Sequence, residues 1–164
     1  MFFRRRRSQF SEPQDQPLFI AIRRDDPELL RAYARASETI TLFHSHVMRP
    51  GDHMCCVKLR FRDPEESDEQ SFVYLWLHAV LYHPADRRYS GTFFELPPEL
   101  TAWHQVGERI AFEAAEVLDW MVNDDGRVHG AFTMRVVRAR LPRSERSAYD
   151  RYSGITVWEP EPTA

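Results

Sequence analysis

The stretch DWMVNDDGRVHGAFTMR, residues 119–135, decides the fold that we predict for this chain. Residues 123–126 within it are Asn, Asp, Asp and Gly, which tolerate positive φ and are typical of a tight turn between two ordered segments. After the turn, apolar and polar residues alternate over 128–136, which predicts a half-buried strand. Before it, the spacing of the apolar residues over 113–121 predicts a short helix whose apolar side includes Trp120. We therefore expect Trp120 to anchor the core and not to form an exposed binding surface.

Length and composition favour one globular domain. The chain has 164 residues, of which 43% are hydrophobic and 13% aromatic, enough to bury one core. The formal net charge of −3 argues against nucleic acid as the default partner.

Cysteine usage and apolar runs bear on the compartment. Cys55 and Cys56 are adjacent and would point to opposite faces of a strand, so an ordinary disulfide between them would be strained. The N-terminal MFFRRRR lacks the apolar run of a secretory signal, and no run reaches the roughly 18 apolar residues of a membrane span. A cytoplasmic protein is the expectation.

The chain divides into three parts. Residues 1–16, an arginine run followed by polar residues, predict a flexible arm. Residues 17–142 predict a single α+β domain, and residues 143–164 a C-terminal extension, within which we expect Ile155, Val157 and Trp158 to pack back on the domain.

Within the domain, one long helix is expected to lie across a sheet. Asp26 is placed to cap it, Pro27 suits its first turn, and an apolar stripe continues to Val47. Strands are predicted over 17–22, 54–62, 72–82, 89–96, 109–112 and 128–136, with 72–82 as a central strand covered on both faces and a bulge at 136–137 where the alternation changes phase. The predicted fold is a twisted antiparallel sheet of about five to six strands, with a partial barrel as the alternative, the long N-terminal helix across it, and a short helix before the final hairpin strand.

The loop over 63–70 is strongly acidic. Five of its eight residues carry carboxylates, namely Asp63, Glu65, Glu66, Asp68 and Glu69. A solvated hairpin loop and a docking site for a basic partner are both consistent with this charge.

The order of these signals resembles a known family. The residues that carry the resemblance are DDPE at 25–28, VKLRFRD at 57–63, Trp76, GT at 91–92, GERI at 107–110, DWM at 119–121, DG at 125–126 and GAFTMR at 130–135. Over about residues 20–142 the chain resembles the bacterial YegJ-type conserved domain of unknown function. The resemblance implies no particular activity, and the chain departs from it in the arginine-rich arm, in the segment before Val57 and after Pro142.

One cluster has the residue types of a metal site. His44, His46, His53, Cys55 and Cys56 lie within thirteen residues, and His46, His53 and one cysteine would be the ligands of such a site. The spacing fits zinc poorly, because His44 and His46 diverge by about 200° on a helix. We predict no metal and no cofactor.

Acidic residues of the opening stretch invite a catalytic interpretation. Asp124 and Asp125 are explained by turn chemistry, whereas Asp119 beside Trp120 should be partly buried and needs a partner, for which we predict Arg135. The chain has no G-x-S-x-G, H-E-x-x-H or glycine-rich phosphate loop, so we predict no enzyme.

The remaining alternatives concern partners. The sequence favours a non-enzymatic protein-binding module of a bacterial cytoplasm, with an immunity protein that neutralises a toxin as its concrete form. The alternatives are a small metal-binding protein and a nucleic-acid-binding accessory protein. The latter would use the basic and aromatic residues Arg4–Arg7, Arg135, Arg138, Arg140, Arg143, Arg146, Tyr149 and Tyr152.

Overall fold

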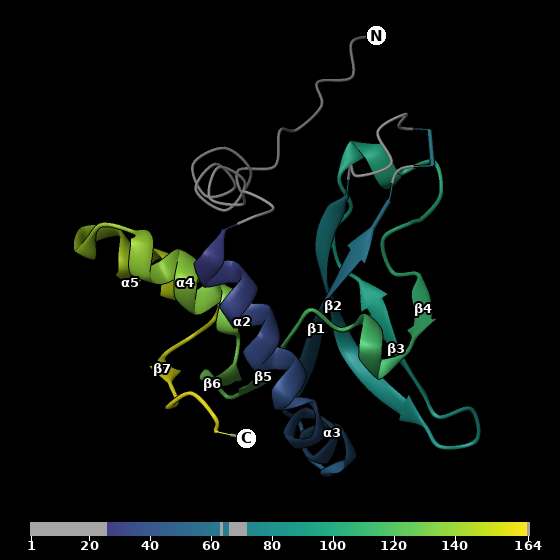
Figure 1. Cartoon of the computed structure of the whole chain (residues 1–164), viewed down its shortest axis with the longest axis horizontal. Helices are drawn as coiled ribbons and strands as arrows, with labels where there is room; N and C mark the ends of the chain where they lie inside the picture. Colours follow the sequence, from purple (N-terminus) through teal and green to yellow (C-terminus); the bar gives the residue numbers. More distant parts are fainter. Residues whose placement is uncertain (1–25, 63, 66–71, 164) are drawn as a thin grey trace, which may run out of the picture.

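The computed structural model describes residues 26–62, 64–65 and 72–163, so the predicted arm over 1–16 and the predicted strand over 17–22 lie outside the described residues. The helices are α2 (Pro27–Glu38), α3 (Ile40–Met48), α4 (Phe132–Arg140) and α5 (Arg143–Tyr152), with short 3-10 turns η1 (Pro98–Leu100) and η2 (Ala114–Glu116). The strands are β1 (Met54–Phe61), β2 (Val73–His83), β3 (Arg88–Phe93), β4 (Arg109–Phe112), β5 (Asp119–Asp124), β6 (Arg127–Gly130) and β7 (Val157–Trp158). The α+β class is confirmed (Figure 1).

The described strands form one open sheet. Its order is β4-β3-β2-β1-β5-β6-β7, and each neighbouring pair is antiparallel except β6 and β7, which are parallel. The prediction of five to six strands was too low, and the partial barrel is wrong, because β4 and β7 remain as edges.

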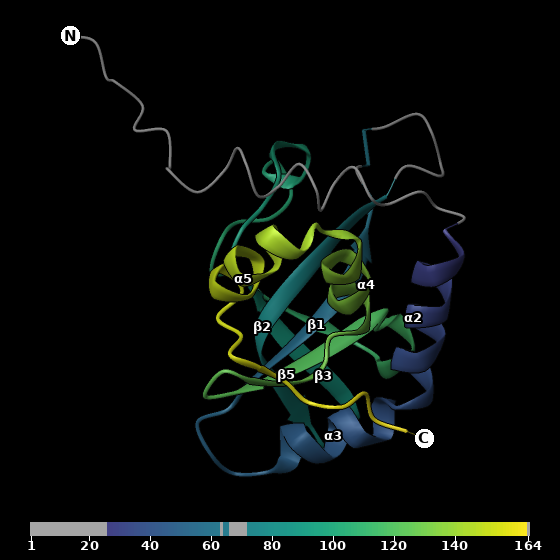
Figure 2. The same cartoon turned by 90° about the vertical axis from the view of Figure 1, so that its left-hand side faces the viewer.

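Both faces of the sheet bury apolar residues. On one face, the alternate β1 residues Cys55, Val57 and Leu59 belong to the main core with α2 and α3. On the other face, Cys56 belongs to a smaller core with Met121, Val128, Ala131 and Ile155. Figure 2 places α4 and α5 in front of β1 and β2, with α2 and α3 along the edge of the view. The middle of the sheet therefore has buried apolar side chains on both of its faces.

The predicted long helix is two helices. Asp26 caps α2 as predicted, since its carboxylate accepts the N–H groups of Glu28 (3.0 Å) and Leu29 (3.3 Å). The helix ends at Thr39, whose hydroxyl donates to the Arg35 carbonyl (2.7 Å) and accepts the Trp120 indole N–H (3.1 Å). A buried polar residue between the two helices thus binds a core tryptophan, and Figure 1 shows that α3 runs in a different direction from α2.

The secondary structure on both sides of the predicted turn is different from our expectation. The turn is confirmed, with Asp125 and Gly126 at positive φ of 49° and 85°. The predicted helix over 113–121 is wrong: only η2 is helical, and Trp120 lies on β5, which pairs with β1. The predicted strand over 128–136 is wrong beyond Gly130, because α4 begins at Phe132 and also replaces the predicted bulge at 136–137.

Gly130 explains why the strand ends there. Its φ is 69°, and a Cβ at this position would lie 2.5 Å from both a ring carbon and the carbonyl oxygen of Trp120. Ala131 follows in a left-handed conformation (φ 56°), and its N–H donates to the same Trp120 carbonyl at 2.7 Å. The chain therefore folds tightly around Trp120 before it enters α4.

Strand β2 and the C-terminal residues are compared next with the predictions. The strand over 72–82 exists as β2, but β1 is the middle strand, and Tyr74, Trp76 and His78 on β2 remain partly exposed. Residues after Pro142 contribute α5 and β7 to the same sheet and core, with Ile155 buried, Trp158 partly buried and Val157 exposed.

Candidate functional site

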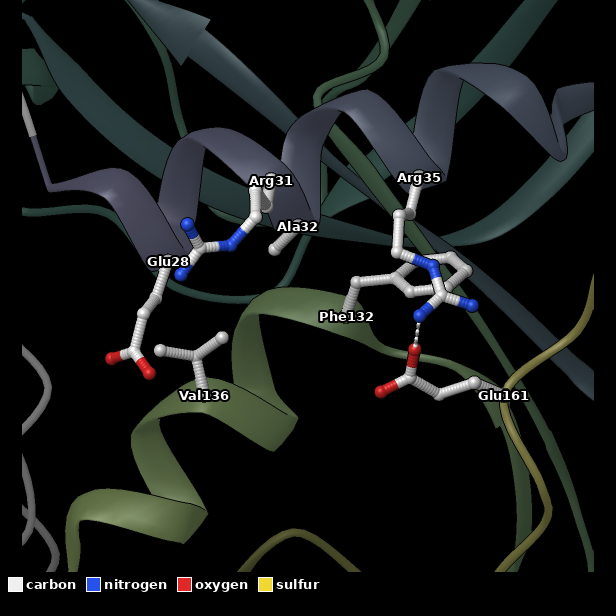
Figure 3. Close-up of a pocket in the computed structure, with 7 residues that line it drawn as sticks. All are labelled: Glu28, Arg31, Ala32, Arg35, Phe132, Val136 and Glu161. Atoms are coloured by element: carbon white, nitrogen blue, oxygen red, sulfur yellow. Dashed lines mark ion pairs between the residues drawn. The ribbon is translucent and has the colours of Figure 1, made fainter.

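A pocket of about 230 Å³ lies between α2 and α4 and is the candidate site (Figure 3). Four α2 residues, two α4 residues and one residue of the C-terminal segment line it: Glu28, Arg31, Ala32, Arg35, Phe132, Val136 and Glu161. The apolar side chains come from the line where the two helices meet, and the charged ones stand at the two ends. Arg31 lies at the end with Glu28, and Arg35 at the end with Glu161.

An ion-pair cluster fixes the first turn of α2 to the end of α4. The Arg140 guanidinium contacts the Asp26 carboxylate (2.6 Å) and the Glu28 carboxylate (2.6 Å). The hydrogen bond from Arg140 lowers the pKa of Asp26 to about 2, which keeps this carboxylate charged at neutral pH. Glu28 is consequently engaged with Arg140 at the rim of the pocket.

Arg35 is occupied by the chain itself. Its guanidinium forms an ion pair with Glu161, donates to the Pro162 carbonyl (3.3 Å) and lies 5.6 Å from the centre of the Phe132 ring. The cation–π contact with Phe132 orients the guanidinium over the apolar floor of the pocket. The C-terminal segment is thereby held against α2.

Arg31 stands one turn before Arg35 on the same side of α2. Within the part of the chain that the structure describes, its guanidinium has no hydrogen bond, ion pair or ring contact. A guanidinium presents five N–H donors in a planar fork that matches a carboxylate. The pocket therefore offers one unused carboxylate-binding group beside one that already holds a carboxylate.

The buried carboxylate of Asp119 sets the position of α4. Asp119 is fully buried and accepts N–H groups from Trp120 (2.8 Å), Phe132 (3.1 Å) and Thr133 (2.7 Å), and the Thr133 hydroxyl (2.6 Å). Ala131 has no side chain that could cap α4, so Asp119 on β5 supplies the acceptor from across the fold. Phe132, which forms the floor of the pocket, is thus placed by Asp119.

Burial, hydrogen bonds and a nearby lysine set the pKa of Asp119, while the hydrogen bonds of Arg135 go elsewhere. Burial raises the pKa of Asp119, whereas the hydrogen bonds from Thr133 and the charge of Lys58 lower it. The buried Lys58 ammonium donates to the Thr133 hydroxyl at 3.4 Å. Our prediction that Arg135 is the partner of Asp119 is wrong, because Arg135 donates instead to the carbonyls of Gly130 (2.8 Å) and Glu159 (2.6 Å).

The geometry suits recognition of a side chain. The pocket is smaller than the roughly 300–1,000 Å³ of small-molecule and cofactor sites. It combines apolar contact with guanidinium groups at its rim, which is what an acidic side chain with a short aliphatic stem can use.

The histidines of the predicted His/Cys cluster have separate contacts. His44 pairs with the Tyr89 hydroxyl (2.8 Å), His53 with the His46 carbonyl (2.7 Å), and His46 lies 5.1 Å from the His129 ring. In the described parts of the chain, no group of three or more His, Cys, Asp or Glu residues could hold a metal ion.

Cys55 and Cys56 are free and buried on opposite faces of β1. Burial raises the pKa of the Cys55 thiol to about 11 and that of Cys56 to about 12. Both side chains are therefore protonated thiols in the folded protein at neutral pH.

Of the predicted protein-binding residues in the acidic loop, Glu65 is described and exposed, whereas Asp63, Glu66, Asp68 and Glu69 lie outside the described residues. The loop thus stays a prediction from its charge.

The arginines considered for nucleic acid binding are mostly engaged within the fold. Arg138 pairs with Asp150 (2.6 Å), Arg146 donates to the Ala139 carbonyl (2.8 Å), and Arg135 and Arg140 are engaged as described above. Arg143 and Tyr152 are exposed and Tyr149 is partly buried. Residues Arg4–Arg7 lie outside the described residues.

The sequence interpretation missed the pocket. The spacing of Arg31 and Arg35 places both on one side of α2, but nothing in the sequence indicates that α4 and Glu161 meet them there. Only the position of α4, which was predicted as a strand, brings these residues together.

Three comparisons place the chain among known proteins. A family model described as "Uncharacterized protein conserved in bacteria (DUF2314)" matches residues 26–157. A protein of Neisseria meningitidis serogroup B, named as an ankyrin repeat protein, is 29% identical over 101 residues, which are 61% of this chain and 38% of that protein. The chain thus spans less than two fifths of that relative's length. No solved structure matches it.

Among the described residues, every helix is too short or too polar to span a bilayer. The family match runs from the capping residue of α2 to the first residue of β7, and so includes every element that forms the pocket except the segment bearing Glu161. The chain therefore belongs to the family of uncharacterized proteins conserved in bacteria, DUF2314.

Proposed function

We propose that this protein is a non-enzymatic protein-binding module of the bacterial cytoplasm, and that the α2–α4 pocket is the surface that engages its partner. The observation that carries the proposal is Arg31, which lines an apolar pocket while its guanidinium has no partner among the described residues. Arginine and aromatic residues are both enriched at protein interfaces, and the pocket holds both. The pocket would bind one protruding side chain of the partner.

The Neisseria relative supports the same class of function. It is named as an ankyrin repeat protein, and repeat arrays of that kind present extended binding surfaces. A shared domain in such a protein is consistent with a role in protein recognition. The acidic loop at residues 63–69 is a second contact in this proposal and would meet a basic region of the partner.

The concrete form of the proposal is an immunity protein that neutralises a toxin, within the YegJ-type group that the sequence resembles. Its distinguishing requirement is that the partner is toxic. Co-expression of the full chain should then restore the growth of cells that express the partner, and Arg31→Gln should weaken that protection.

The test compares two exposed arginines. We would crosslink the full chain in its source cell, recover it and quantify the attached proteins for wild type, Arg31→Gln and Arg143→Gln. Arg143 is the matched control, since it is a helical, exposed arginine without contacts among the described residues. The expected result is one recurring protein that is depleted about ten-fold in Arg31→Gln and retained in Arg143→Gln, as for the loss of one charge-assisted contact.

Two results would count against the proposal. Recovery of no recurring protein with wild type would refute protein binding itself. A recurring protein that Arg31→Gln retains, while charge reversal of Glu65 and Glu66 removes it, would move the binding surface from the pocket to the acidic loop.

A further inference from the structure

The C-terminal segment follows a defined path from β7 to the pocket. The Glu159 N–H donates to the Val128 carbonyl (3.0 Å), and the Glu159 carboxylate contacts Arg127 (3.1 Å). Two residues later, Glu161 reaches Arg35 on α2 (Figure 3). The segment is anchored at Glu159 and places Glu161 in the lining of the pocket.

Prolines make this segment a particular kind of ligand. Pro160 and Pro162 flank Glu161, and proline fixes φ and lacks an N–H donor. A Glu-Pro segment therefore has few N–H donors, and its main polar groups are its carboxylates and its carbonyl groups, which are the two kinds of group that Arg35 contacts. The same chemistry is available to any acidic, proline-containing segment of another protein.

Glu161 pairs with one of the two arginines that line the pocket. Glu161 pairs with Arg35, whereas Arg31, one turn away on α2, has no partner among the described residues. The side chains of Arg35 and Glu161 are 42% and 38% exposed, and ion pairs at such exposure are weak because water and salt screen them. A ligand with a carboxylate for each arginine would bind better than Glu161 does.

We propose that the pocket recognises an acidic, proline-containing segment of a partner protein, and that Glu161 occupies the Arg35 end as an internal ligand which the partner displaces. This inference rests on the proposed function and names its ligand. The partner segment places one carboxylate at Arg31 and one at Arg35, with the aliphatic part of its side chains against Phe132 and Val136.

The test uses the chain's own tail as a probe. A fluorescent peptide with the sequence of residues 158–164, WEPEPTA, is titrated with full-length protein at low salt, and binding is followed by fluorescence anisotropy. Glu161→Gln removes the internal competitor, so this variant should bind the peptide about three-fold more tightly than wild type does. A peptide with both glutamates replaced by glutamine should not bind.

Matched variants locate the binding site. In the Glu161→Gln background, Arg31→Gln and Arg35→Gln should each weaken binding about ten-fold, and Arg143→Gln should leave it unchanged. Thermal unfolding of every variant shows that the fold is intact, which is expected because all four side chains are exposed or partly exposed.

The outcomes separate this inference from the proposed function. Equal peptide affinity of wild type and Glu161→Gln would overturn the internal-ligand inference, and so would equal effects of Arg31→Gln and Arg143→Gln. If the partner recovered from cells still depends on Arg31 in that case, the proposed function stands and its ligand is of another chemistry. If recovery does not depend on Arg31 either, both proposals fail.

Discussion

The indole of Trp120 is completely buried among the described residues. The rings of Phe43 and Phe132 lie 5.5 and 5.7 Å from it, Gly130 lies against its ring, and its N–H is shared by the Ala36 carbonyl (3.2 Å) and the Thr39 hydroxyl (3.1 Å). Its complete burial confirms the predicted core anchor, although the residue lies on a strand.

Trp120→Ala should therefore lower the free energy of unfolding by about 3 to 5 kcal/mol, a large part of the roughly 5 to 15 kcal/mol of a typical domain. Trp103→Ala is the control, because Trp103 is 49% exposed and its loss should change stability by no more than about 0.5 kcal/mol. Urea unfolding measures both. Equal unfolding midpoints for wild type and Trp120→Ala would show that Trp120 does not hold the core.

Asp119 carries a second prediction at the residue scale. In Asp119→Asn, the NH2 group replaces one of the two carboxylate oxygens, so it would face either the N–H donors of Trp120 and Phe132 or the N–H donor of Thr133. This conflict should cost about 1 to 3 kcal/mol. Thr133→Val removes the hydroxyl that donates to Asp119 and accepts from Lys58, but keeps the backbone N–H groups that Asp119 caps, and should cost about 1 kcal/mol. Chemical denaturation of both variants tests the difference. A smaller loss for Asp119→Asn than for Thr133→Val would contradict the capping role.

At the scale of elements, the ion-pair cluster of Arg140 with Asp26 and Glu28, which joins α2 to α4, predicts that the stability of the fold depends on pH. The pKa of Asp26 is about 2 in the folded protein, against an ordinary value of 3.8. A lowered carboxyl pKa stabilises the fold above the unfolded value, and this contribution disappears as the pH falls from about 4 to about 2. We therefore expect the contribution of the Asp26–Arg140 ion pair to stability to be lost over that pH range.

Asp26→Asn isolates the ion pair, because asparagine caps a helix as well as aspartate does. Wild type should melt at a higher temperature than Asp26→Asn at pH 6, and the two curves should converge near pH 2. Calorimetry over this range measures the difference. A difference that persists unchanged at pH 2 would mean that the charge of Asp26 is not its source.

Elements with local signals were predictable. Asp26 and Pro27 mark the start of α2, alternation marks β1, and Asp125-Gly126 marks the hairpin turn. The exchange of helix and strand around Trp120 was not, because the N-terminus of α4 is capped by a carboxylate thirteen residues earlier. Local periodicity contains no information about this contact between Asp119 and the start of α4. The pocket depends on the contact, because it places Phe132.

At the scale of the whole molecule, β7 and α5 complete the fold. The parallel pairing of β7 with β6, the buried Ile155 and the contact between Arg138 and Asp150 all join residues after Pro142 to earlier elements. Sequence patterns gave the α+β class, but not the order of the strands or the joining of this last segment to the sheet.

A chain that ends at Pro142 should therefore melt at a lower temperature and lose near-ultraviolet circular dichroism. A chain that ends at Glu159 keeps α5 and β7 and should melt close to wild type. Thermal melts of the three chains test this. If the shorter chain melts like the full one, residues 143–164 contribute nothing to the core.

The two neighbouring thiols of β1 can report separately on the local opening of the two buried clusters. Cys55 lies in the larger buried cluster, with residues of α2 and α3, and Cys56 lies in the smaller one, with Met121, Val128, Ala131 and Ile155. A protonated, buried thiol does not react with alkylating reagents until its surroundings open. Alkylation rates of Cys55→Ala and Cys56→Ala at pH 8 would thus measure the opening of the two clusters separately. We expect the smaller cluster to open first, and equal rates would show that the two clusters open together.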